Sequence, residues 1–170
     1  MLRVFLVPVF VFLLLKPIFG GVNKWVVLTI FCIACLTDFL DGKIARKYNL
    51  ITDFGKFMDP LADKLLVCSA LICLIDLGKL PSWFVVIVIA REFVVSGLRL
   101  IAVDNGIVIA ASWWGKFKTA FQMTLIILLL VDIEALKVIT VTIFWITLFL
   151  TLISMVDYIW KNRSVVSQTK

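Results

Sequence analysis

Histidine is absent from this chain of 170 residues. Its absence excludes a histidine nucleophile, a histidine general base and any histidine metal ligand. Cysteine is scarce, and the four cysteines (Cys32, Cys35, Cys68 and Cys73) all lie inside apolar runs. We therefore interpret them as small side chains on buried helices, because partners for a zinc site are missing nearby and the spacing implies no disulfide framework.

Apolar residues make up 63% of the chain, far more than a soluble domain of this size needs. A transmembrane helix requires roughly 20 apolar residues, so the chain has room for about six such helices. We predict an all-α integral membrane protein with six transmembrane helices, forming a single domain over residues 1–170, with no separate soluble domain and no cleaved secretory signal. The expected helices are Leu2–Phe19, Trp25–Leu40, Pro60–Leu77, Trp83–Val103, Trp113–Val131 and Ala135–Trp160.

Basic residues between the apolar runs predict the orientation in the membrane. The net charge is +6, and in an apolar chain this favours anionic lipid headgroups and phosphorylated substrates over nucleic acid as partners. With six crossings both termini share one side, and the excess of lysine and arginine there places that side in the cytoplasm. That side collects Arg3, Lys43, Arg46, Lys47, Lys56, Lys64, Arg91, Arg99, Lys116, Lys118, Lys161, Arg163 and Lys170, whereas the other has Lys16, Lys24, Lys79 and Lys137.

Between the second and third runs lies an acidic motif, D-x2-D-G-x2-A-R-x8-G-x3-D-x3-D. Its acids are Asp38, Asp41, Asp59 and Asp63, with Asp53 as an extra acid outside the pattern. The spacings of three and four residues place each pair on one helical face. Four carboxylates would repel one another without compensation, and two divalent cations supply the opposite charge. All-oxygen ligands favour Mg²⁺ or Mn²⁺. The alternative is a solvated loop face with ordinary ion pairs, which leaves Gly42 and Gly55 unexplained.

The motif resembles the signature of the CDP-alcohol phosphatidyltransferase family, and every motif position is filled. The resemblance implies a six-helix fold, a homodimer and transfer of a substituted phosphate from a CDP-linked donor to an alcohol, with release of CMP. It assigns Asp38, Asp41, Asp59 and Asp63 to two metal ions and makes Asp63 the catalytic base for the acceptor hydroxyl. It also assigns the CDP pocket to Asp41, Gly42, Ala45, Arg46 and Gly55, with Arg46 at the pyrophosphate.

A second cluster indicates the acceptor. Arg91, Arg99, Lys116 and Lys118 are expected near the same cytoplasmic face, and arginine forks suit a phosphate monoester. The R-E-F-x3-G-L-R and G-K-x-K-T stretches resemble phosphatidylglycerophosphate synthases of bacteria. The resemblance implies CDP-diacylglycerol as donor and sn-glycerol 3-phosphate as acceptor, in the bacterial plasma membrane with the active site cytoplasmic. Positive-inside topology alone is an alternative explanation of Lys116 and Lys118, and Glu92 could pair with either arginine.

Two other functions stay open at this point. A member of the same family could use inositol phosphate, another phosphorylated alcohol or phosphatidylglycerol as acceptor, since the acidic motif does not separate these. A small cation transporter could use intramembrane acids as an ion path. Transporters often contain internal repeats, and the chain shows none, so the transferase is favoured.

Overall fold

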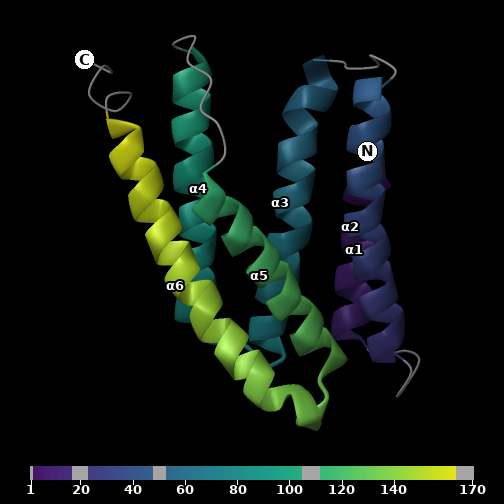
Figure 1. Cartoon of the computed structure of the whole chain (residues 1–170). Helices are drawn as coiled ribbons and strands as arrows, with labels where there is room; N and C mark the ends of the chain where they lie inside the picture. The colour runs from purple at the N-terminus through teal and green to yellow at the C-terminus, as the bar shows by residue number, and fades with distance from the viewer. Residues whose placement is uncertain (1, 17–22, 48–52, 105–111, 164–170) are drawn as a thin grey trace. The chain divides into compact units, whose positions relative to one another are not determined.

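In the computed structural model the described residues form six α-helices and a short 3₁₀ helix (Figure 1). The structure describes residues 2–16, 23–47, 53–104 and 112–163, and within them the side chains of residues 6–16, 24–37, 64–102 and 112–163. Over these ranges all the regular structure is helical, which confirms the predicted all-α class there. The helices are α1 (Leu2–Leu15), α2 (Asn23–Lys47), α3 (Asp53–Asp76), α4 (Ser82–Asp104), α5 (Trp113–Val131), η2 (Glu134–Leu136) and α6 (Lys137–Lys161).

Each predicted apolar run corresponds to one α-helix, but several ends differ. α1 ends at Leu15, four residues short of the predicted Phe19, and Pro8 lies inside it. α2 continues past the predicted Leu40 and through the first two acids of the motif to Lys47. α3 begins at Asp53 rather than at Pro60. The charged motif is therefore helical on both sides of residues 48–52, which lie outside the described part.

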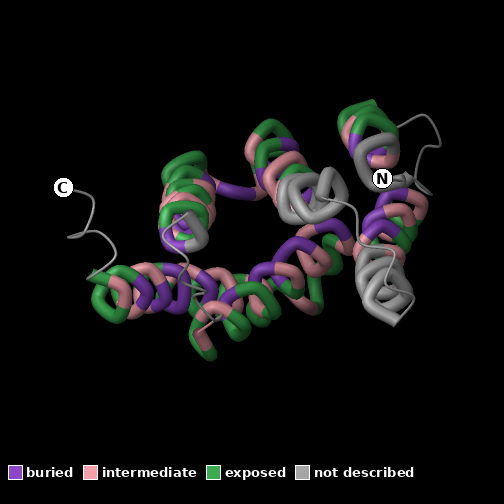
Figure 2. The backbone as a smooth tube through the Cα atoms, turned by 90° about the horizontal axis from the view of Figure 1, so that it is seen from above, coloured by how far each residue is buried: buried purple, intermediate pink, exposed green. Residues whose placement is uncertain are grey.

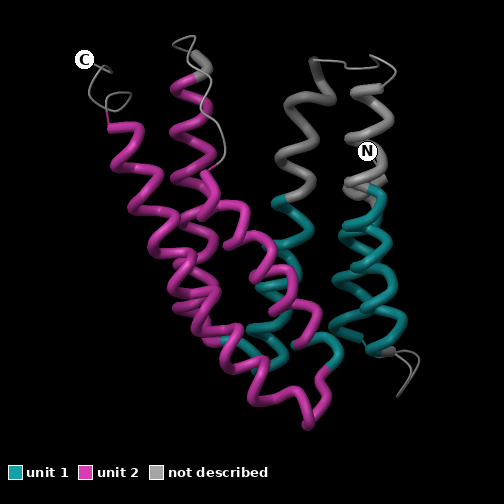
Figure 3. Tube along the Cα trace, in the orientation of Figure 1, with its two compact units in different colours: residues 1–80, 129–131 teal, residues 81–128, 132–170 magenta. Residues whose placement is uncertain are grey.

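The chain divides into two compact units: residues 1–80 with 129–131, and residues 81–128 with 132–170 (Figure 3). In unit 1, α1 packs against both α2 and α3. Val27, Phe31 and Ala34 are buried at one-turn spacing on α2. The ring of Phe10 on α1 lies 5.7 Å from that of Phe31. The apolar faces of these helices thus form the core of unit 1.

The carboxyl end of α3 is closed by Gly78, whose φ is +69°. The amide of Gly78 donates to the carbonyl of Ile75, and the amide of Lys79 donates to the carbonyl of Leu74. This pair of bonds is the Schellman arrangement, which favours glycine in the left-handed position. The interval between the third and fourth predicted helices therefore begins with a helix cap at Gly78 and Lys79.

In unit 2, α4 packs against α6. The rings of Phe84 and Phe144 lie 4.5 Å apart at one end of the contact. Farther along, Arg91 is hydrogen-bonded to Ser154, beyond which Arg99 is bonded to Tyr158. Because the contacts advance in the same direction along both helices, α4 and α6 run parallel.

Buried and exposed positions alternate around the helices (Figure 2). Within the described residues, two helical segments are long and apolar enough to cross a bilayer, Trp113–Val131 and Glu134–Lys161. Leu6–Leu15 and Lys24–Thr37 are shorter apolar helices. These features support a helical membrane protein, whereas the number of six crossings stays a prediction.

Candidate active site

The four motif acids are divided between two consecutive helices of unit 1. Asp38 and Asp41 lie on α2, and Asp59 and Asp63 lie on α3. Residues 48–52 join the helices, so the acid-bearing parts of α2 and α3 lie at the same end of the unit (Figure 1). The four side chains fall outside the described residues, so their predicted role as metal ligands and that of Asp63 as base stay predictions.

The predicted CDP-binding positions lie at the same helix ends. Gly42, Ala45 and Arg46 belong to the last turns of α2. Gly55 belongs to the first turn of α3. Glycine lacks the side chain that would keep a nucleotide from the backbone. The side chains of Ala45 and Arg46 lie outside the described ranges, and for all four residues only the placement on these helices is established.

Pro60 lies about two turns inside α3 rather than in its first turn. Proline has no amide hydrogen to donate to the preceding turn and crowds the carbonyl four residues before it. The sequence-based prediction began the third helix at Pro60, whereas the structure has Pro60 in the interior of that helix. Pro60 thus interrupts the hydrogen-bond ladder of α3 directly after Asp59.

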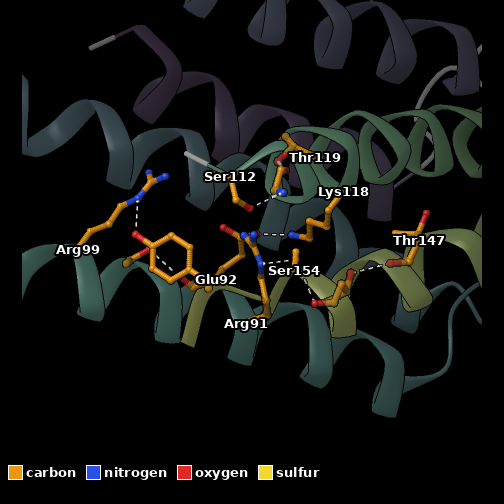
Figure 4. Close-up of polar contacts among 12 residues, drawn as sticks. Arg91, Glu92, Arg99, Ser112, Lys118, Thr119, Thr147 and Ser154 are labelled. Atoms are coloured by element: carbon orange, nitrogen blue, oxygen red, sulfur yellow. Dashed lines mark hydrogen bonds and ion pairs between the residues drawn. The ribbon is translucent and has the colours of Figure 1, made fainter. Parts of the chain in front are cut away.

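In unit 2, three charged side chains meet between α4 and α5. Glu92 Oε1 accepts from Arg91 Nη1 at 3.2 Å and from Lys118 Nζ (Figure 4). Arg91 and Lys118 are buried, and the side chain of Glu92 is 19% exposed. Buried charges are stable only when they are paired. The sequence left Arg91 and Arg99 as possible partners of Glu92. In the structure Glu92 is paired with Arg91 and also with Lys118.

Both arginines of α4 are tied to hydroxyl groups of α6. Arg91 Nε donates to Ser154 Oγ at 3.1 Å. Arg99 Nε donates to Tyr158 Oη, also at 3.1 Å, and its guanidinium carbon lies 5.8 Å from the centre of the Tyr158 ring. These contacts show that Arg91 and Arg99 lie on the face of α4 that packs against α6.

The start of α5 lies close to Arg91. Ser112 caps this helix by accepting from the amide of Gly115 at 3.1 Å. A Cβ atom added at Gly115 would lie 3.1 Å from Arg91 Nη2. Glycine therefore permits the close approach of α5 to the guanidinium.

The predicted acceptor residues are only partly brought together. Arg91 and Lys118 share Glu92, and Arg99 lies about two turns farther along α4. Lys116 is exposed, and its Nζ lies 4.8 Å from the ring centre of Trp113. This is a cation–π contact at an exposed position.

The sequence was compared with models of known protein families. The family model of the CDP-alcohol phosphatidyltransferases matches residues 1–153. The chain belongs to the CDP-alcohol phosphatidyltransferase family. The match includes both helices of the acidic motif and the paired arginines of α4, so the predicted family is confirmed.

Several curated proteins resemble this CDP-alcohol phosphatidyltransferase over most of its length. The CDP-diacylglycerol–glycerol-3-phosphate 3-phosphatidyltransferase of Bacillus subtilis is 39% identical, covering 94% of this chain and 90% of its own. A probable phosphatidylglycerophosphate synthase of Mycobacterium tuberculosis is 43% identical over 94% of this chain and 77% of its own. A CDP-diacylglycerol–glycerol-3-phosphate 3-phosphatidyltransferase of Rickettsia typhi is 37% identical over 92% and 89%.

Two residues that contact the arginines of this CDP-alcohol phosphatidyltransferase, Ser154 and Tyr158, were not predicted from the sequence. The signal was present: Thr147, Thr151, Ser154 and Tyr158 recur every three or four residues in a mostly apolar helix. This spacing puts them on one face, and all four are buried. A row of hydroxyls inside a membrane helix indicates contact with another helix.

Proposed function

We propose that this chain transfers the phosphatidyl group of CDP-diacylglycerol to sn-glycerol 3-phosphate, giving phosphatidylglycerol phosphate and CMP in phospholipid biosynthesis. The observation that carries the proposal is the complete acidic motif in a chain that is 39% identical to a relative named for this reaction, across 94% of its length. The match extends well beyond the motif and includes the stretches around Arg91 and Lys118.

The acceptor assignment is supported by the buried cations of unit 2. Arg91 and Lys118 are buried cations from two helices, and both contact Glu92. Positively charged donors gathered in a buried setting suit a doubly charged phosphate monoester. An alcohol without phosphate, such as choline or serine, needs no such charge. Arg99 and Lys116 complete the proposed set for the acceptor phosphate.

The donor set of the acidic motif fits two Mg²⁺ or Mn²⁺ ions. Asp38, Asp41, Asp59 and Asp63 supply only carboxylate oxygens, with formal charge −4 that two divalent ions balance. Metal ions so bound stabilise charge on the oxygens of a transferring phosphoryl group. We propose that all four acids bind metal and that Asp41 also contacts the CDP moiety.

The chain's own residues would handle the nucleotide and the proton. Gly42, Ala45 and Gly55 would allow the backbone to approach CDP, and Arg46 would bind its diphosphate. Asp63 would accept the proton of the acceptor's primary hydroxyl as that oxygen bonds to the phosphorus next to diacylglycerol. The bond from this phosphorus to the oxygen of CMP breaks in the same displacement.

We also propose that the protein is a homodimer in the bacterial plasma membrane and crosses it six times, with both termini and the active site on the cytoplasmic side. The excess of lysine and arginine on that side supports the orientation. Six apolar runs in the sequence support the number of crossings, and two of the described helices are long and apolar enough to span a bilayer.

An assay of purified protein tests the proposal. Protein in detergent receives CDP-diacylglycerol, Mg²⁺ and one alcohol from a panel of glycerol 3-phosphate, inositol phosphate, phosphatidylglycerol, serine and choline. CMP release and the mass of the lipid product are measured, with and without EDTA. We expect CMP and phosphatidylglycerol phosphate only with glycerol 3-phosphate, and neither with EDTA. CMP release with another alcohol alone would reassign the acceptor, and no release with any alcohol would contradict the transferase proposal.

A further inference from the structure

We infer that Ser154 and Tyr158 on α6 are positioning residues for acceptor binding, because they fix the guanidinium groups of Arg91 and Arg99 by their Nε atoms. The inference rests on the proposed function, since it assigns the two arginines to the acceptor phosphate. It adds residues that lie outside both the acidic motif and the arginine-rich stretches.

The hydrogen bonds of Ser154 explain how it holds Arg91. Its hydroxyl donates to the carbonyl of Thr151 at 3.1 Å, so its own proton is occupied within α6. The lone pairs of Oγ remain, and one accepts from Arg91 Nε. Ser154 is fully buried and Arg91 is 5% exposed, so water does not compete at this contact. A hydrogen bond to a charged group in such a setting is strong.

Tyr158 repeats this arrangement one turn later. Its side chain is 2% exposed, and its hydroxyl accepts from Arg99 Nε at 3.1 Å. The face of the ring lies under the guanidinium and adds a cation–π contact. Arg99 is itself exposed, so without this anchor its long side chain would sample many rotamers.

Ser154 and Tyr158, the two anchors, determine which guanidinium nitrogens of Arg91 and Arg99 remain available to bind a phosphate. In Arg91, Nε is taken by Ser154 and Nη1 by Glu92. In Arg99, the hydrogen bond within the described residues is the one at Nε, which leaves Nη1 and Nη2 as a paired end. That end matches two phosphate oxygens. Arg99 would therefore grip the acceptor phosphate in a bidentate manner, while Arg91 and Lys118 would supply charge around Glu92.

Preorganisation gives the anchors a kinetic signature. A guanidinium held before binding loses less conformational entropy when the phosphate arrives. Losing the anchor should thus weaken acceptor binding and leave the donor site unchanged. A residue needed only for folding would lower the active fraction, and hence kcat, without changing either KM.

The test compares three nearly isosteric variants of α6: Ser154→Ala, Tyr158→Phe and Thr147→Val as the control. Thr147 is equally buried and lies on the same face, but its hydroxyl donates to the carbonyl of Ile143 within its own helix. We expect the KM for glycerol 3-phosphate to rise about tenfold in Ser154→Ala and Tyr158→Phe, with the KM for CDP-diacylglycerol unchanged. Thr147→Val should match the wild type in both constants.

A coupling experiment shows whether Tyr158 acts through Arg99. In an Arg99→Lys background, Tyr158→Phe should change the acceptor KM by less than twofold, because the anchored guanidinium is already gone. Calorimetric titration measures the affinity of each single variant for inorganic phosphate. Ser154→Ala and Tyr158→Phe should bind phosphate more weakly than Thr147→Val, and the measurement is also possible for variants that turn over too slowly to assay.

Three results would overturn the inference. In the first, Ser154→Ala and Tyr158→Phe have the same KM for glycerol 3-phosphate as the control Thr147→Val; in the second, the KM values for donor and acceptor rise equally. In the third, the effects of Tyr158→Phe and Arg99→Lys on the acceptor KM are additive. These results differ from a failure of the proposed function, in which wild-type protein releases no CMP with glycerol 3-phosphate. In that case, phosphate binding that is weakened by Tyr158→Phe and not by Thr147→Val would still support the anchoring role.

Discussion

Two acidic residues of unit 2 differ sharply at the scale of single side chains. Glu92 lies between Arg91 and Lys118, whose side chains are 7% and 1% exposed. Glu134 lies 3.8 Å from Lys137, with side chains that are 96% and 75% exposed. Buried pairs leave an uncompensated charge when one partner is removed, whereas exposed pairs contribute little.

We predict that Glu92→Gln lowers the free energy of unfolding by about 3 kcal/mol, because two buried cations lose a shared carboxylate partner. Glu134→Gln should change it by less than about 0.5 kcal/mol. Thermal unfolding of both variants in the same detergent measures the difference. Equal melting temperatures for the two would show that Glu92 does not neutralise the buried charges.

The residues of this network were predictable only in part. Arg91 and Arg99 stood out because charges in an apolar run are costly and therefore informative. The sequence did not reveal that Lys118, rather than Arg99, would share Glu92 with Arg91. That choice depends on how α5 packs near α4, which Gly115 permits and which no spacing within one helix encodes.

At the scale of helices, the effect of replacing glycine by alanine depends on the backbone conformation at that position, and two glycines allow the comparison. Gly78 has φ +69°, and Gly97 lies inside α4 with ordinary helical φ. A Cβ atom added at either would meet nothing within 4 Å among the described residues. We predict that Gly97→Ala stabilises the fold by about 0.5–1 kcal/mol, whereas Gly78→Ala destabilises it by roughly 1–2 kcal/mol. Melting temperatures that move in the same direction would contradict the Schellman cap at Gly78.

Gly115 differs from both because its space is occupied. Alanine there would place Cβ 3.1 Å from Arg91 Nη2 and 3.5 Å from Ser112 Oγ. Arg91 cannot move freely, since Ser154 and Glu92 hold it. We predict that Gly115→Ala gains none of the stability that Gly97→Ala gains and raises the KM for glycerol 3-phosphate several-fold. A Gly115→Ala variant with higher stability and unchanged KM would show that α5 has room to yield.

The helices themselves followed from the apolar runs, because roughly 20 such residues in sequence have few alternatives to a buried or lipid-facing helix. Their ends were harder to predict. α2 and α3 continue into the charged motif, where hydropathy falls although the helix persists. Proline gave a misleading start for α3, because an interior proline and a first-turn proline look alike in sequence.

At the scale of the whole molecule, the orientation in the membrane can be tested at the two ends of α6. Lys137 begins this helix and Lys161 ends it. In a variant without native cysteines, we predict that Lys137→Cys reacts with a membrane-impermeant maleimide in intact cells. Lys161→Cys should react only after permeabilisation, because the positive-inside rule places it in the cytoplasm. The reverse pattern would invert the proposed topology and place the active site outside.

The most direct test of the central claim, that the motif acids hold the metal ions of a phosphatidyltransferase, is a matched pair of substitutions on α3. Asp59 belongs to the motif and Asp53 does not, yet both change to asparagine with the same loss of charge. CMP release from CDP-diacylglycerol and glycerol 3-phosphate is measured in Mg²⁺ for wild type, Asp59→Asn and Asp53→Asn at equal folded concentration. The account predicts near wild-type turnover for Asp53→Asn and none detectable for Asp59→Asn. Substantial turnover by Asp59→Asn would contradict it.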